Sequence, residues 1–235
     1  MEKLVHGTHQ FRTGVFLAKL PLVRQTLAEG QRPLAMMITC SDSRVDPEAL
    51  TQADPGELFV LRNAGNIVPP FGATRGGEAA TVEYAVNVLG VRDLIVCGHS
   101  HCGAMQALVN PATVDPRTAV GRWLEHAEAT RQILWAKYPH LDGEPLVDRA
   151  VRENVLVQLG HLGTHPAVAA GLARRELRLH GWVLCLDTGT VDAFDPGRGR
   201  FVPLNGDAGP GVLPPPFAPL PLTAGEVGGR DLQPA

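Results

Sequence analysis

The sequence lacks a strong net charge, a long apolar run and a cysteine-rich framework. Its 235 residues include 21 Lys and Arg against 24 Asp and Glu, a formal net charge of −3. This balance excludes the basic footprint of nucleic-acid binding and of attachment to an anionic membrane. No apolar run approaches the roughly 18 residues that cross a bilayer, and no long apolar stretch follows the first charged residues. We therefore expect a cytoplasmic protein without a secretory signal.

Cysteine is scarce, and the four that are present are too few for a disulfide scaffold in a chain of this length. The roles left are a packed thiol, a catalytic thiolate and a metal ligand. Cys97 and Cys185 lie inside apolar runs and are predicted to pack in the core. Cys40 and Cys102 instead follow such runs and have polar or small neighbours, which makes them candidates for chemistry.

Three apolar runs of strand length occupy residues 33–39, 58–61 and 94–97. Because these runs are continuous and do not alternate with polar residues, they favour a parallel sheet covered on both faces. Residues 76–90, between the second and third runs, have the apolar spacing of a helix. The sequence thus predicts a βαβ unit and an α/β fold with a mainly parallel central sheet flanked by helices.

The remaining segments predict an arm, further helices, an edge hairpin and a tail. Residues 8–29 have helical spacing, with Pro21 expected to break the arm into two short helices and Gly30 expected to end it. Helices are predicted at 118–138, 145–162 and 166–179, followed by an antiparallel edge hairpin of 181–187 and 191–194. The last thirty residues hold seven Pro and six Gly. We expect one domain over 1–205, including the N-terminal helical arm 1–30, and an extended or disordered tail over 206–235.

Two polar clusters follow the first and third apolar runs: Cys40-Ser41-Asp42-Ser43-Arg44 and His99-Ser100-His101-Cys102-Gly103. Ligands of open α/β sheets bind beyond the carboxyl ends of the strands. If the two strands are neighbours, Cys40, His99 and Cys102 converge on one point. Two thiolates and an imidazole suit one Zn²⁺ per chain, and three protein ligands leave the fourth position open, as in catalytic zinc sites. Such a site gives hydroxide near neutral pH.

Asp42 and Arg44 are predicted to form a catalytic dyad. The Arg44 guanidinium can bind both carboxylate oxygens, which would keep Asp42 ionised and away from the metal. Asp42 could then accept a hydrogen bond from the zinc-bound hydroxide and orient it. An ordinary ion pair at a strand end is the alternative, and the proximity of Cys40 favours the catalytic role.

The histidines other than His99 carry weaker signals. His101 is predicted to point away from the candidate ligands on either side of it, in a structural or solvent role. The others have no partner pattern and are predicted to lie at the surface: His6, His9, His126, His140, His161, His165 and His180.

The two polar clusters together resemble the zinc motifs of the β-class carbonic anhydrases. Residues 58–66 (LFVLRNAGN) and 76–85 (GGEAATVEYA) are similar to the stretches between those motifs, in the plant-type branch with its cyanobacterial members. The resemblance implies Cys40, His99 and Cys102 as zinc ligands and Asp42 with Arg44 as the dyad. The implied reaction is the reversible hydration of CO₂ to bicarbonate and a proton.

The resemblance also implies a substrate pocket. Gln31 would supply an amide donor to a substrate oxygen, and Phe59 and Tyr84 would form the apolar wall that a neutral linear molecule needs. Plain core packing is the alternative for the two aromatic residues. Gly103 would let a backbone N–H approach the site closely.

Members of the resembled family form homodimers that can pair into larger assemblies, with the arm over a neighbour and the active site at the interface. Cyanobacterial relatives can be packaged in carboxysomes, so the tail is either a docking segment or a solvated end, and we favour the solvated end. Two other functions stay open at this stage. One is hydrolysis of a CO₂-like molecule such as carbon disulfide, and the other is a non-catalytic zinc or bicarbonate-sensing module in which Asp42 binds the metal.

Overall fold

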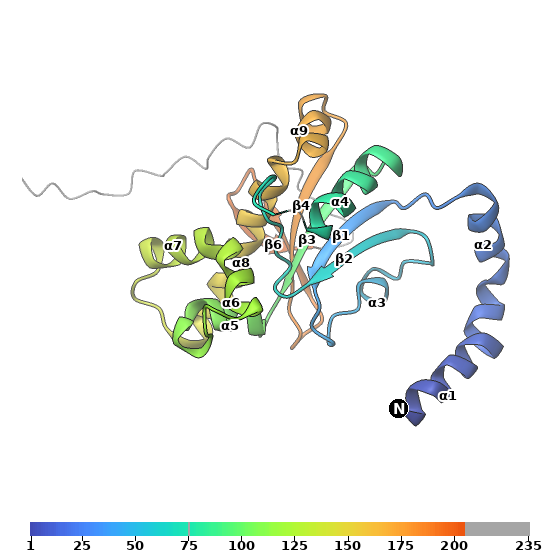
Figure 1. Ribbon diagram of the computed structural model, residues 1–235, viewed down its shortest axis with the longest axis horizontal. Helices are drawn as coiled ribbons and strands as arrows, with labels where there is room; N and C mark the ends of the chain where they lie inside the picture. The colour runs from blue at the N-terminus through green and yellow to red at the C-terminus, as the bar shows by residue number, and fades with distance from the viewer. Residues whose placement is uncertain (75, 205–235) are drawn as a thin grey trace, which may run out of the picture.

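A central sheet of six strands organises the chain in this computed structural model, which describes residues 1–74 and 76–204 (Figure 1). The strands are β1 (Ala35–Cys40), β2 (Leu58–Asn63), β3 (Asp93–His99), β4 (Arg178–Leu184), β5 (Val191–Asp195) and β6 (Arg200–Pro203). Their order is β2-β1-β3-β4-β5-β6. The first four strands are parallel, and β5 and β6 add antiparallel to β4. The predicted α/β class, with a mainly parallel sheet and an antiparallel edge, is confirmed.

Helices cover this sheet mainly on one face. They are α1 (Glu2–Gln10), α2 (Phe16–Glu29), α3 (Pro47–Thr51), α4 (Gly77–Glu83), α5 (Gly103–Val109), α6 (Ala119–Leu124), α7 (Glu128–Lys137), α8 (Gly143–Gly163) and α9 (Pro166–Ala173). Wider π-helical turns at Phe11–Val15 and Tyr84–Val88 join α1 to α2 and extend α4. None of the helices in the described residues is long and apolar enough to span a membrane.

The strands that precede the two polar clusters are direct neighbours. Thr39 of β1 pairs with Cys97 of β3, so the carboxyl ends of both strands lie at the same edge of the sheet. The crossover from β2 through α4 to β3 passes over β1 and confirms the predicted βαβ unit. This register brings the segments after Cys40 and His99 together.

The main core lies between the sheet and the helices α4, α8 and α9, and it buries Ile38, Leu94 and Leu179 completely. A smaller cluster on the opposite face includes Met37, Ile95 and Leu50 of α3. The expectation that both faces are covered therefore holds only in part within one chain. The strand β2 is an edge strand, and its side chains are mostly half-buried for that reason.

The arm differs from its prediction at Pro21. The helix α2 continues through Pro21, so the expected break is wrong. The fixed φ of proline suits a helix, and the lost N–H leaves only the carbonyl of Leu17 without its helical bond. Leu17 is 56% exposed, so water can satisfy that carbonyl. Gly30 ends the arm with φ 82°, as predicted.

Several other predictions need correction. The helix predicted over 166–179 ends at Ala173, and its last residues begin β4, while β6 was not anticipated. Cys97 is fully buried as expected, but Cys185 is only half-buried and follows β4. His165 and His180 are 3% exposed, because each finds an internal acceptor, Pro69 O and Asp93 Oδ1 respectively. The tail predicted over 206–235 lies outside the described residues.

Candidate metal centre

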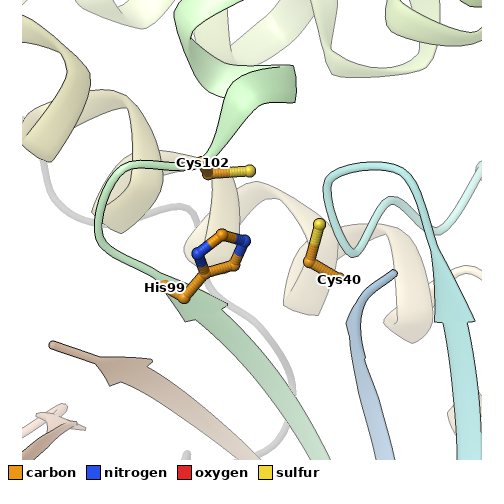
Figure 2. A group of neighbouring side chains, drawn as sticks. All are labelled: Cys40, His99 and Cys102. Atoms are coloured by element: carbon orange, nitrogen blue, oxygen red, sulfur yellow. The ribbon is translucent and has the colours of Figure 1, made fainter. Parts of the chain in front are cut away.

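Cys40, His99 and Cys102 point toward a common space at the carboxyl edge of the sheet (Figure 2). Cys40 ends β1, His99 ends β3, and Cys102 immediately precedes α5. One sulfur or nitrogen atom from each lies within 4.8 Å of the others. The three residues are 6%, 0% and 1% exposed. The three side chains that were predicted to converge do lie together, and they are buried away from solvent.

The imidazole of His99 is oriented by its own loop. Its Nδ1 lies 2.8 Å from the carbonyl oxygen of Ser100, a contact in which Nδ1–H donates. Its Nε2 is buried and has no hydrogen-bond partner in the described part of the chain. A buried polar atom without a partner costs free energy, and histidines that bind metals commonly donate the other ring nitrogen to a carbonyl. His99 is thus arranged to bind a cation through Nε2.

The two thiols are electronically unequal. A hydrogen bond from the Cys102 thiol, together with one from the Gly65 N–H, lowers the pKa of Cys40 against the opposing effect of burial. The same contact with Cys40, together with burial, raises the pKa of Cys102. A divalent cation binds cysteine in its thiolate form, so metal binding here would release thiol protons. Two sulfurs and one imidazole match the donor preference of Zn²⁺.

Asp42 and Arg44 form a forked ion pair beside this group. Arg44 Nε donates to Asp42 Oδ1 at 2.9 Å, and Arg44 Nη2 donates to Oδ2 at 2.7 Å. The side-chain hydrogen bond from Arg44 holds the pKa of Asp42 well below its ordinary value. Asp42 Oδ2 lies 3.9 Å from His99 Nε2, so the ionised carboxylate faces the three candidate ligands without belonging to their group.

Arg62 of β2 hydrogen-bonds the backbone of both Cys40 and Asp42, a contact that the sequence did not predict. Its Nε donates to the carbonyl of Cys40 at 3.0 Å, and its Nη2 donates to the carbonyl of Asp42 at 2.8 Å. Arg62 pairs in register with Thr39, the residue before Cys40. A cationic residue at the end of an apolar strand was the available signal, but only the strand order shows what it reaches.

The residues predicted to bind substrate do not all lie beside the three candidate metal ligands. Phe59 and Tyr84 pack together, with ring centroids 6.0 Å apart. Phe59 pairs with Met36, whereas Cys40 pairs with Asn63, so the aromatic pair lies four residues away along the strand, about 13 Å.

Gln31 and Gly103, the other two predicted substrate-binding residues, differ in their position relative to the candidate ligands. Gln31 is exposed in the linker between α2 and β1. Gly103 follows Cys102 directly and has open space where a side chain would begin. Within one chain, Gly103 is near the three candidate ligands, whereas Phe59 and Tyr84 are not.

His101 has other partners. Its Nε2 lies 2.9 Å from Asp187 Oδ2, and its Nδ1 lies 3.5 Å from Glu144 Oε2. Its carbonyl accepts a hydrogen bond from Arg44 at 3.2 Å. Its ring is therefore engaged by carboxylates, in keeping with the predicted structural role.

Comparisons with known proteins agree with one another. A family model described as carbonic anhydrase matches residues 35–191. A carbonic anhydrase of Pseudomonas aeruginosa is 50% identical over 204 residues, which cover 87% of this chain and 92% of that protein. The solved structure of the β-carbonic anhydrase CcaA has a TM-score of 0.84 and 45% identity, covering 88% of this chain and 93% of that one. The structures of two tetrameric β-carbonic anhydrases from Sordaria macrospora include a match with TM-score 0.71 and 27% identity, covering 85% and 98%.

Proposed function

The chain belongs to the β-class carbonic anhydrases, and from that membership we propose that it hydrates CO₂ reversibly with one Zn²⁺ held by Cys40, His99 and Cys102. The observation that carries the proposal is the approach of these three side chains within 4.8 Å, all buried, at the ends of neighbouring strands. Within the described residues, the buried Nε2 of His99 has no hydrogen-bond partner, which supports a cation at this point. Zn²⁺, when bound, would lower the pKa of a water molecule enough to supply hydroxide near neutral pH.

Asp42 is proposed to orient the nucleophile. The carboxylate stays ionised at neutral pH because Arg44 hydrogen-bonds both of its oxygens. An ionised carboxylate can only accept hydrogen bonds, so it fixes the direction in which a bound solvent molecule presents its lone pair. Arg44 in turn keeps Asp42 from turning toward the metal. Arg62 supports the pair by holding the backbone carbonyls of Cys40 and Asp42.

The substrate pocket is proposed to be completed by a second copy of the chain. Gly103 lies beside Cys102 and offers its backbone to the substrate. Phe59 is about 13 Å along β2 from the level of Cys40, and Tyr84 packs against Phe59, so one chain does not bring both to the same CO₂ molecule. Gln31 is exposed beside the arm. In the proposed homo-oligomer, Gln31, Phe59 and Tyr84 of one copy form the apolar wall and amide donor for its partner.

The arm supports such an assembly. Its helices stand away from the sheet (Figure 1), and none of their residues is buried by the described part of the chain. Leu4 and Phe11 are 65% and 54% exposed. The less covered sheet face has an open hollow of about 500 Å³ lined by Leu34, Ala35, Asp93, Ile95, Arg178, His180 and Trp182. We propose that the arm of one copy covers this face of another, as a step toward assemblies such as the tetrameric Sordaria enzymes.

Stopped-flow CO₂ hydration on the metal-loaded protein tests the proposal. Removal of metal with a chelator is expected to abolish catalysed hydration, and added Zn²⁺ is expected to restore it. Mg²⁺ serves as the control cation, because sulfur and imidazole ligands do not favour it. Undiminished hydration after metal removal would contradict the metal site, and an inactive zinc-loaded protein would contradict the reaction.

A further inference from the structure

The helix α8 presents a row of polar side chains to the loop that follows β2. Asn154 Nδ2 donates to the carbonyl of Gly65 at 3.0 Å, and Gln158 Oε1 accepts from the N–H of Val68 at 2.9 Å. His161 Nδ1 lies 2.8 Å from the carbonyl of Val68. Spacings of four and three residues place these side chains on one face of the helix. Asn154 and Gln158 are 1% and 0% exposed, so the contacts form deep in the protein.

The loop held by this row touches the candidate metal centre at one atom. The N–H of Gly65 donates to Cys40 Sγ at 3.4 Å. Gly65 has φ 82°, and a Cβ there would lie 2.8 Å from the Cβ of Ala104. Only glycine combines that backbone conformation with such a close approach. The residue whose N–H reaches the sulfur is thus the residue whose carbonyl Asn154 holds.

We propose that Asn154 is a positioning residue that holds Gly65 so that its N–H hydrogen-bonds the Cys40 thiolate, which sets how strongly that sulfur binds the metal. The inference rests on the proposed function, because it takes Cys40 to be a metal ligand. An N–H donor stabilises the sulfur lone pair and fixes the direction in which it points. Partners outside the ligand set typically change metal affinity by 10–100-fold when they are removed.

Cobalt substitution tests the proposal independently of turnover. The wild-type protein loaded with Co²⁺ is expected to show a sulfur-to-metal charge-transfer band. Asn154→Leu removes the donor to Gly65 and keeps the number and branching of the side-chain heavy atoms. We expect this variant to shift the band to longer wavelength, because the sulfur lone pair rises in energy. We also expect metal binding to weaken about 10-fold in chelator competition, because the sulfur loses the contact that fixes its direction.

Thr130→Val is the matched control. Thr130 is fully buried, and its hydroxyl donates to Asn154 Oδ1 at 3.2 Å, so the variant removes one bond of the same network without touching Gly65. It is expected to keep the wild-type band and affinity. If Asn154→Leu fails to fold, Asn154→Ser replaces it, because the shorter side chain does not reach the carbonyl of Gly65.

The outcomes separate the two levels of the proposal. A wild-type protein without a charge-transfer band would contradict the metal centre itself. A wild-type band that stays unmoved in the Asn154 variant would overturn the role of Asn154 alone. A band that moves equally in Thr130→Val would also overturn it, because the shift would then follow a general loosening of the network.

Discussion

At the scale of single residues, a second Asp-Arg pair shows that the spacing of Asp42 and Arg44 does not by itself make a catalytic dyad. Asp115 and Arg117 have the same Asp-x-Arg spacing, and Arg117 Nη2 donates to Asp115 Oδ2 at 2.8 Å, in the same forked geometry. No metal-binding group accompanies that pair among residues 1–74 and 76–204. The local pattern alone therefore makes a forked pair, and only the position beside Cys40 and His99 makes one of them a candidate dyad.

Asp42→Asn is expected to lower kcat/KM for CO₂ hydration by about 100-fold, because the amide no longer presents two acceptor oxygens to the nucleophile and Arg44. Zinc content should stay at one ion per chain, because Asp42 is not among the three candidate ligands. Elemental analysis and stopped-flow hydration measure the two quantities. Asp115→Asn is the control and should keep wild-type turnover. Near-normal activity of Asp42→Asn would refute the orienting role.

Asp93 shows how a single carboxylate links stability to pH. Burial raises the pKa of Asp93, but hydrogen bonds from Arg178 and His180 outweigh it, and the net effect is a lowered pKa. A carboxylate with a lowered native pKa stabilises the fold above its unfolded pKa, about 3.9, and loses that contribution as pH falls through the native value. These contacts tie the starts of the neighbouring strands β3 and β4.

Asp93→Asn should therefore cost about 1–2 kcal/mol of unfolding free energy at pH 7, and less as the pH drops below about 4. Urea unfolding of the metal-free wild type and variant over this pH range gives the difference directly. A gap between the two proteins that stays constant down to pH 3 would contradict the linkage.

At the scale of elements, the packing of α8 on the sheet depends on small residues in the strands. A Cβ at Gly181 of β4 would lie 2.9 Å from Val155 Cγ1 and 3.0 Å from Leu159 Cδ1. A Cβ at Gly98 of β3 would lie 3.0 Å from both Val151 Cγ1 and Val155 Cγ2. The close approach of α8 is what brings Asn154 within reach of the loop at Gly65. The same helix thus supports both the core and the candidate metal centre.

Gly181→Ala is expected to destabilise the protein by about 1–3 kcal/mol, because the added methyl group overpacks a closed interface. Val155→Ala removes one of the crowded methyl groups and should cost stability by itself through a cavity. In the double variant the two costs should sum to more than the measured loss, since the new methyl group occupies the vacated space. Strict additivity in denaturant unfolding would show that the interface relaxes in another way.

At the scale of the whole molecule, the exposed arm and the separated aromatic pair point to the same partner, a second copy of the chain. No residue of the arm is buried within the part of the chain that the structure describes, and Phe59 and Tyr84 lie away from the candidate ligands of their own chain. Both facts are explained if copies exchange surfaces. Conversely, an assembly that left the arm free would leave its apolar side chains in water.

Deletion of residues 1–29 is expected to lower the assembly state measured by light scattering and to reduce CO₂ hydration with it, while zinc content is kept. The candidate ligands Cys40, His99 and Cys102 all lie outside the deleted segment, so metal analysis is the internal control. A truncated protein with the mass and turnover of the full chain would contradict the proposed role of the arm.

Much of the fold could be predicted from local patterns. Continuous apolar runs indicated parallel strands, and helical spacing before β3 indicated the crossover, because burial and periodicity are written into neighbouring residues. The predicted helix break at Pro21 is wrong because solvent exposure of the surrounding turn decides whether the missing N–H ends the helix. That exposure depends on the tertiary structure and cannot be seen in neighbouring residues. His165 and His180 were misjudged because their buried acceptors come from distant segments.

The sequence by itself determined which chemistry is available. It places sulfur and imidazole donors after two strands, and it places Arg44 where its guanidinium can bind the carboxylate of Asp42. Local spacing along the chain is enough for these features, because Asp42 and Arg44 are two residues apart and His99 and Cys102 are three residues apart. The tertiary structure alone decided the strand order, the approach of the three candidate ligands, the hydrogen bonds of Arg62 to the backbone, and the contacts of α8 with the loop at Gly65. The hydrogen bonds of Arg62 and of α8 join residues 20 to 93 positions apart, and only the packing of the whole core brings such residues together.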